Sequence, residues 1–219
     1  FALLFFSLGL WQIERGQAKT NLLDDFEKKI LEKPSYINQK SQKWDRVYVE
    51  GKWDSSKQIL IDNVIRRGIA GYKVLTPLRM KETDQLILVD RGWIKQNTFR
   101  DQLPDIKLIQ IDEVVSGILE IPELGLVLSD DLVSKEWPKI SQSKNLDILS
   151  KEYNYSLEPY ILVLNEEVPG TNLNSLDFIG IVPTTMMPVK HYGYSMTWFS
   201  MFLAICFMYL WIGFKRNEE

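Results

Sequence analysis

The chain has 219 residues, of which 45% are hydrophobic, and its 26 basic and 29 acidic side chains give a formal net charge of −3 at pH 7. A slightly acidic balance provides no broad basic surface, so nucleic acid is excluded as a partner. The single cysteine, Cys206, excludes a disulfide, a CxxC redox pair and a cysteine metal cluster within this sequence.

The first segment, residues 1–13, is apolar and carries an aromatic residue, Trp11, near its end. A membrane-crossing helix needs roughly 20 residues, so the segment as it stands is too short to span. No small-residue cleavage site follows it, and the chain runs directly into Glu14 and Arg15, which argues against a signal peptide. We interpret the segment as the incomplete end of a first transmembrane helix. A buried helix of a soluble protein is the alternative.

Residues 14–190 are predicted to form one domain between two membrane segments. Apolar residues recur at helical spacing from Leu22 to Leu31, and Pro34 ends the pattern. Strand-like runs bounded by turn residues follow at 46–53, 58–65, 71–78, 86–89, 109–119 and 160–164. One interior helix at 144–153, capped by Ser143, is predicted to pack on the sheet. These elements predict an α+β domain with a mostly antiparallel sheet that rolls toward a barrel.

A second apolar run begins at Tyr192 and ends at Phe214, where Lys215 and Arg216 close it. Its length matches the roughly 20 residues that cross hydrocarbon, so we predict a transmembrane helix at 191–214 and a short inner-side tail at 215–219. Two spans with short tails place the whole domain on one side of the membrane. Basic residues flank both membrane faces, so charge alone does not set the orientation.

Motifs of the common enzyme classes do not occur in the sequence. There is no GxSxG, HExxH, Walker loop or GxGxxG, and the only histidine, His191, lies outside the predicted domain. Paired acids at 130–131 and 166–167 are interpreted as solvated turns, because nothing else converges on them. The pair Arg66-Arg67 before a glycine is interpreted as an exposed hairpin turn in preference to an anion site. The sequence therefore predicts that the protein is not an enzyme.

The run LILVDRGWI at residues 86–94 joins an apolar strand to an acid, a base, a glycine and an aromatic residue. Arg91 could clamp a carboxylate with two hydrogen bonds, and Trp93 could offer a stacking face. The alternative is a strand end in which Asp90 and Arg91 pair locally and Gly92 allows a β-bulge. The residues alone leave both interpretations open.

His191 stands at the mouth of the second apolar run. It could simply lie in the interfacial zone beside Lys190, hydrogen-bonded to water or lipid headgroups. However, His191, Tyr194 and Trp198 fall at i, i+3 and i+7, which brings an imidazole, a phenol and an indole to one helix face. A neutral imidazole with flanking aromatic rings is typical of axial ligation of a flat, apolar macrocycle.

Four sequence blocks occur in an order that resembles the Surfeit locus protein 1 family, the Shy1-like assembly factors of cytochrome c oxidase. They are LGLWQIER at 8–15, GYKVLTPL at 71–78, LVDRGWI at 88–94, and HYGY at 191–194 followed by Trp198 and Phe199. Together they frame nearly the whole chain.

The resemblance implies two membrane helices and a large domain on the outer side of an energy-conserving membrane. It implies a role in bringing haem a to subunit I of the oxidase, with other assembly factors and the lipid membrane as partners, and with His191 as the haem ligand. The chain departs from the family pattern at Lys190 and Asp90, where the family usually has asparagine. An ammonium can donate a hydrogen bond but cannot accept one, which changes what position 190 can do for the imidazole.

Our hypothesis from the sequence is a holding site without catalytic turnover. His191 coordinates the haem iron, Tyr194 and Trp198 line the porphyrin, and Lys190 and Arg91 neutralise the propionates. The expected location is the bacterial cytoplasmic membrane with a periplasmic domain, ahead of the mitochondrial inner membrane with a domain in the intermembrane space.

Two alternatives remain open from the sequence. The first is a docking factor that stabilises partly assembled subunit I without holding haem, through small residues of the second helix: Gly193, Ser195, Ser200 and Ala204. The second, from another class, is a membrane-anchored sensor or ligand-binding domain with a pocket within residues 35–185.

Overall fold

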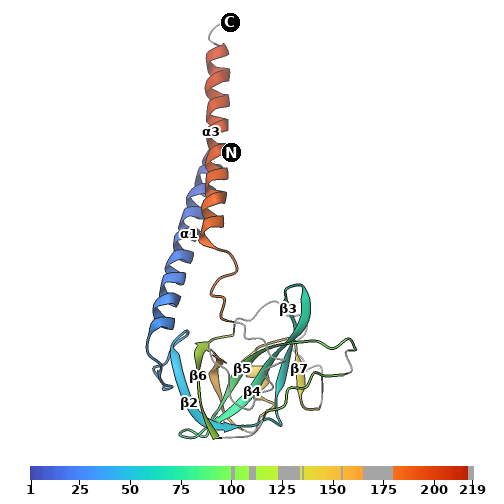
Figure 1. Cartoon of the computed structure of the whole chain (residues 1–219). Coiled ribbons are helices and arrows are strands. Elements are labelled where there is room, and N and C mark those ends of the chain that lie inside the picture. Colours follow the sequence, from blue (N-terminus) through green and yellow to red (C-terminus); the bar gives the residue numbers. More distant parts are fainter. Residues whose placement is uncertain are drawn as a thin grey trace. The chain divides into compact units, whose positions relative to one another are not determined.

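The computed structural model in Figure 1 describes residues 1–99, 102–108, 112–122, 134, 136–153, 155–164 and 180–216. The chain divides into two compact units. The helix unit comprises Phe1–Lys28 and Val182–Glu219, and the barrel unit comprises Lys29–Ile181. The predicted acid pairs at 130–131 and 166–167 lie outside the described residues.

The barrel unit is built on one sheet, in which the structure describes eight strands. They are β1 (Ser35–Tyr36), β2 (Arg46–Trp53), β3 (Ile59–Arg66), β4 (Ile69–Met80), β5 (Leu86–Lys95), β6 (Asp112–Glu120), β7 (Lys139–Ser141) and β8 (Leu157–Leu164). A short helix, α2 (Leu146–Ser150), precedes β8.

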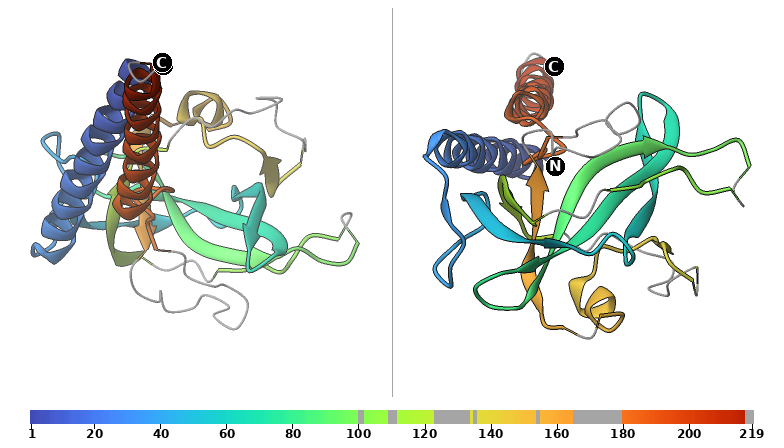
Figure 2. Two further views of the ribbon diagram at one scale, coloured as in Figure 1. Left: turned by 90° about the horizontal axis from the view of Figure 1, so that it is seen from above. Right: turned by 60° about the horizontal axis from the view of Figure 1, so that its bottom comes forward.

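The sheet closes into a five-stranded barrel because its order, β2-β6-β8-β5-β4, is completed by a pairing between β2 and β4. The neighbouring strands in this ring are antiparallel, except for β5 and β8, which are parallel. Both views of Figure 2 show the strands curling around a common interior. The prediction of a mostly antiparallel, barrel-like sheet is confirmed. Strands β1, β3 and β7 extend the sheet beyond the ring.

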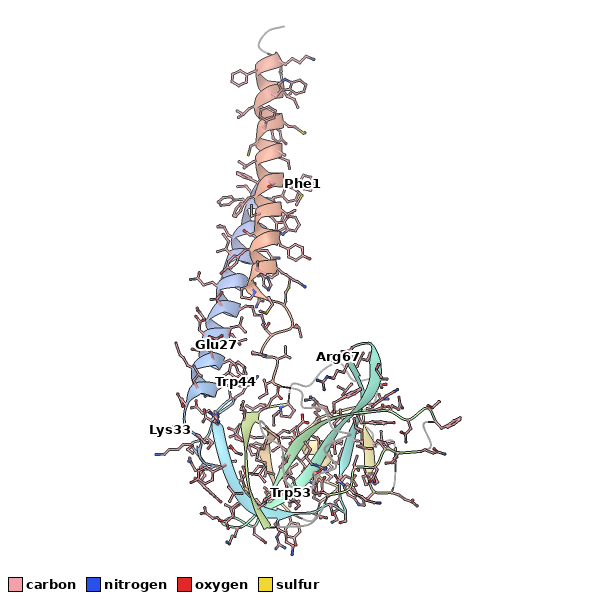
Figure 3. All side chains as sticks on the ribbon, viewed as in Figure 1. Phe1, Glu27, Lys33, Trp44, Trp53 and Arg67 are labelled. Atoms are coloured by element: carbon pink, nitrogen blue, oxygen red, sulfur yellow. The ribbon has the colours of Figure 1, made fainter. Side chains whose placement is uncertain are left out.

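Alternation of side chains decides which residues fill the barrel. In β2 the buried positions are Val47, Val49, Gly51 and Trp53, with more exposed residues between them, as a strand with one face toward a core requires. Trp53, labelled in Figure 3, is 1% exposed and belongs to the interior cluster. The opposite face of β4, β5 and β8 carries a second apolar cluster, which Leu149 and Tyr153 help to cover. Strand β5 is therefore buried on both faces.

Two local predictions at glycines are confirmed. Arg67 (φ 49°) and Gly68 (φ 77°) form the two-residue connection between β3 and β4, and positive φ at both positions is typical of a type I′ hairpin turn. Arg67 lies at the tip of this hairpin in Figure 3. Gly92 has φ 121°, and β5 advances three residues from Asp90 while β4 advances two, which is a β-bulge.

The interior helix was predicted too long and with the wrong cap. It covers Leu146–Ser150, and Asn145 is its N-cap, with the Asn145 side chain accepting a hydrogen bond from the Asp147 amide at 2.9 Å. The Ser143 hydroxyl instead accepts from the Asn145 amide at 3.0 Å, so it organises the turn before the helix. Strands β1 and β7 were not predicted, because two or three residues are too few to show a period.

The helix unit consists of α1 (Ala2–Leu31) and α3 (Pro188–Arg216). The predicted membrane segment at 1–13 and the predicted helix at 22–31 are parts of one continuous helix, α1. By length and composition α3 is the one helix among the described residues that could cross a membrane. The prediction of two spans is therefore not confirmed, because the first predicted span, at 1–13, does not meet this criterion. The domain boundaries at residues 13 and 191 stay predictions.

Candidate functional site

Two glycines of α1 allow close packing against α3. A Cβ atom added at Gly9 would lie 2.7 Å from the Phe199 ring, and one added at Gly16 would lie 2.7 Å from the Tyr192 ring. Small residues permit this kind of approach between membrane helices. The earlier glycine of α1 meets the later residue of α3, and the later glycine meets the earlier residue, so the two helices run antiparallel. The Ser195 hydroxyl also donates to the Gly9 carbonyl at 2.9 Å.

This packing encloses His191, which is only 9% exposed although it lies in the first turns of α3. Its Nδ1 atom is 2.8 Å from Oε1 of Gln12 on α1. An amide oxygen only accepts hydrogen bonds, so this arrangement requires Nδ1 to carry the proton. In the neutral ring, Nε2 then holds a free lone pair.

Nε2 of His191 is buried and has no hydrogen-bond partner within the described residues. A buried polar atom without a partner is uncommon in folded proteins and costs about 1–3 kcal/mol. A histidine whose Nδ1–H donates to an oxygen is the form that binds metals through Nε2. The arrangement could therefore supply one imidazole nitrogen as a ligand to a metal ion.

The predicted site residues on α3 do not all share the environment of His191. Trp198 is half-buried and packs on Phe5 of α1, with ring centroids 5.6 Å apart. Tyr194 is 52% exposed, because at 3.6 residues per turn it lies about 60° around the helix from His191. Lys190 is exposed at the start of α3. The structure thus brings Trp198 and His191 onto the α1-facing side and leaves Tyr194 and Lys190 outside it.

Arg91 belongs to the barrel unit, and its place there corrects the prediction. It is 1% exposed, and Nη1 contacts Oε1 of Gln58 at 2.7 Å, the Ile106 carbonyl at 3.2 Å and Oγ1 of Thr76 at 3.3 Å. Burial lowers the pKa of Arg91 to about 10. A guanidinium enclosed in this way does not present itself to a propionate at a surface, so we remove Arg91 from the candidate site.

The alternative of a local Asp90–Arg91 pair is also wrong. Asp90 forms a buried ion pair with Lys73 on the neighbouring strand, at 2.6 Å, and its other oxygen accepts from the Gly92 amide at 3.0 Å. Neighbouring residues of a strand point to opposite faces, which separates the two charged groups.

Sequence reasoning missed Gln12, the partner of His191. The two residues are 179 positions apart, so no local spacing connects them. The available signal was a polar amide in the otherwise apolar run FALLFFSLGLWQI at 1–13. Such a group needs a hydrogen-bond partner wherever the helix is buried or surrounded by lipid.

Comparison with known proteins gives a consistent result. A model of the SURF1 family matches residues 1–203. A SURF1-like protein of Rickettsia prowazekii is 24% identical over 97% of this chain and 86% of its own length. Human Surfeit locus protein 1 is 24% identical over 96% of this chain and 73% of its own length. The yeast cytochrome oxidase assembly protein SHY1 is 27% identical over 43% of this chain and 26% of its own length.

Proposed function

The chain belongs to the SURF1 family, and from this premise we propose that it is a membrane-anchored assembly factor of cytochrome c oxidase that holds haem a for subunit I. The name of the yeast relative supports the assembly role. The role requires a cargo to be held and then released, and it needs no catalytic turnover.

One observation carries the haem part of the proposal, namely the free lone pair of Nε2 on His191. Nδ1 is engaged by Gln12 and Nε2 has no partner within the described residues, which is the state of a histidine ready to ligate iron. Within those residues no three His, Cys, Asp or Glu side chains gather. A single histidine would suit a haem iron, because the porphyrin would supply the other nitrogen ligands.

Other residues of the helix unit have supporting roles in this proposal. Gln12 fixes the ring orientation and the tautomer of His191. Trp198, packed on Phe5, provides an aromatic wall beside it, and Tyr194 flanks the site. Lys190 offers an exposed ammonium at the start of α3, where a carboxylate of the cargo could be neutralised.

Access to Nε2 requires movement of the chain itself. Because Nε2 has no exposed surface, the packing of α1 on α3 around Gly9 has to loosen before a ligand can reach it, while the contact of Gln12 with Nδ1 is kept. The free energy of this opening subtracts from the affinity for the cargo, since only the open fraction is competent to bind. A lowered affinity suits a carrier that must release its cargo.

The proposed membrane arrangement extends beyond α3. Phe1, just before α1, and Leu3, Leu4 and Leu10 of α1 are at least 50% exposed, and such a concentration of exposed large apolar side chains is suited to lipid. We therefore place the first part of α1 in the membrane beside α3, with residues 14–190 on the outer side. The proposed location is the bacterial cytoplasmic membrane with a periplasmic domain, ahead of the mitochondrial inner membrane.

The test is an absorption spectrum of the detergent-purified protein after co-expression with haem a synthesis. The native chain and a Ser195→Ala control, which loses only the bond to the Gly9 carbonyl, are expected to show a reduced haem band. His191→Ala and His191→Gln are expected to lose it. Equal haem content in all four proteins would remove His191 as the ligand.

A docking factor that does not hold haem is the second candidate, and one observation favours it. Gly193, Ser200 and Ala204 are exposed and lie on one face of α3, and a Cβ atom at Gly193 would meet nothing within 4 Å. Such a face suits close packing of another membrane helix. Subunit I that co-purifies with a folded protein free of haem would favour this candidate.

A further inference from the structure

A cavity of about 490 Å³ opens in the barrel unit, away from the residues considered so far. It lies between the segment that begins with β1, the connection from β4 to β5, and the start of β8. Its polar and aromatic lining includes Tyr36, Asn38, Glu82, Thr83, Glu158 and Tyr160.

The charge of the cavity is negative. Glu82 and Glu158 line it, and no lysine or arginine does so within the described part of the chain. Burial raises the pKa of Glu158. Burial, together with the charges of Glu82 and Glu50, raises the pKa of Tyr36. Burial is the largest cause of both shifts, and no neighbouring cation is among their causes.

Several carboxylates of the barrel unit form ion pairs with basic side chains. Asp45 pairs with Lys29 at 2.7 Å, Glu50 with Lys81 at 2.6 Å, and Asp84 with Arg79 at 2.6 Å. The buried Asp90 pairs with Lys73, and Glu152 pairs with Lys139. Glu82 and Glu158, by contrast, make no ion pair within the described residues. Two acids without an ion pair in the described residues therefore line one cavity.

The cavity also has walls suited to an organic cation. The Tyr36 hydroxyl is buried near Glu82, whose charge and hydrogen bonding contribute to the raised pKa of Tyr36. The Tyr36 ring is fixed by an edge contact with Tyr48 at 5.4 Å, and the Tyr160 hydroxyl donates to the Ser41 carbonyl at 2.9 Å. Aromatic faces attract ammonium and guanidinium groups, and carboxylates bind them by charge-assisted hydrogen bonds.

We propose that this cavity is a binding site for an alkylammonium or alkylguanidinium group, with Glu82 and Glu158 as its anionic partners. A metal ion fits less well, because no three acidic, histidine or cysteine side chains gather in the described residues. The group has two sources: a free small amine or guanidine, and a lysine or arginine side chain of a protein partner. The site lies in the barrel unit and does not depend on the haem proposal.

The experiment is isothermal titration of the full-length, detergent-purified protein with three probes. N-acetyl-arginine amide and methylguanidinium carry the cation, and N-acetyl-citrulline amide is the neutral analogue of the first. The proposal predicts binding of the cations, at least tenfold weaker binding of citrulline, and weakening with added salt. Tighter binding of the arginine derivative than of methylguanidinium would identify a protein side chain as the source, and equal binding would identify a small molecule.

Variants complete the test. Glu158→Gln and Glu82→Gln are each expected to weaken cation binding at least tenfold, whereas Glu27→Gln, which removes an exposed acid of α1, is expected to leave it unchanged. Melting temperatures of the variants verify that they fold. Cation affinity that is the same in Glu158→Gln as in the native protein, or citrulline binding equal to arginine binding, would overturn the proposal.

Discussion

We predict opposite effects on the stability of the helix unit for two substitutions, Gly9→Ala and Gly193→Ala. Replacing glycine by alanine in a helix is favourable by about 0.8–1 kcal/mol because of helix propensity. At Gly193 the new methyl group meets nothing within 4 Å, so this gain should appear undiminished. At Gly9 the methyl group would lie 2.7 Å from the Phe199 ring, which is far inside van der Waals contact.

The size of the effect follows from that contact. Forcing a methyl group into a packed interface costs about 1–3 kcal/mol. The propensity gain is common to both variants, so the difference between them isolates the clash and should be about 1–3 kcal/mol. The assay is unfolding in mixed detergent micelles by sodium dodecyl sulfate, followed by far-ultraviolet circular dichroism. Gly9→Ala combined with Phe199→Leu should recover part of the loss, because the two positions touch.

Haem loading provides the functional readout of the same substitution. If the packing of α1 on α3 around Gly9 must loosen before Nε2 is accessible, a clash of about 1 kcal/mol at Gly9 should strengthen apparent haem binding about fivefold. Gly193→Ala should leave haem binding unchanged. Stabilisation by Gly9→Ala as large as that by Gly193→Ala would refute the packing argument. Weaker haem binding in Gly9→Ala would refute the proposed opening.

Three further predictions concern single side chains. Gln12→Leu should lower haem occupancy while Gln12→Glu, which retains an acceptor oxygen, should preserve it, as measured by the haem absorption band. Lys73→Met should destabilise the protein by about 3–5 kcal/mol in thermal unfolding, because it leaves Asp90 buried without its partner; adding Asp90→Asn should restore much of the loss. Glu158→Gln should stabilise the protein at pH 7. Burial raises the pKa of Glu158 in the folded protein, so ionisation of Glu158 opposes folding at pH values above that pKa. The gain should vanish at low pH, where Glu158 is protonated in both the folded and the unfolded protein.

The periodicity of apolar residues in the sequence predicted those elements that have one buried face and one exposed face. The strand at 46–53 alternates strictly between buried and more exposed residues, so its bounds were predicted correctly. The apolar run in α3 was recognised by length alone, and the glycine at 92 indicated the bulge. In each case the physical cause lies within a few neighbouring residues.

Features that depend on distant residues were not predictable in the same way. One of the two open interpretations paired Asp90 with its sequence neighbour, yet the partner of Asp90 lies on the adjacent strand, seventeen residues away. The parallel pairing of β5 with β8 and the closing pair of β2 with β4 are set by three-dimensional packing. Gln12 and His191 meet only because two glycines bring α1 and α3 together.

The helix cap shows a third kind of failure, in which two residues competed for one role. Ser143 and Asn145 are both good N-cap residues. The chain resolves the competition by using the Ser143 hydroxyl in the preceding turn, where Ser141 also bonds to its backbone. Local preference alone did not rank them.

The central claim is that Nε2 of His191 ligates haem iron, and the sequence permits a direct test because it contains one histidine. The tag-free protein would be produced with ¹⁵N-histidine, loaded with haem a and studied by electron–nuclear double resonance of the oxidised iron. The account predicts a ¹⁵N coupling of the size expected for a directly bound imidazole nitrogen. Loaded haem that shows no such coupling would contradict it.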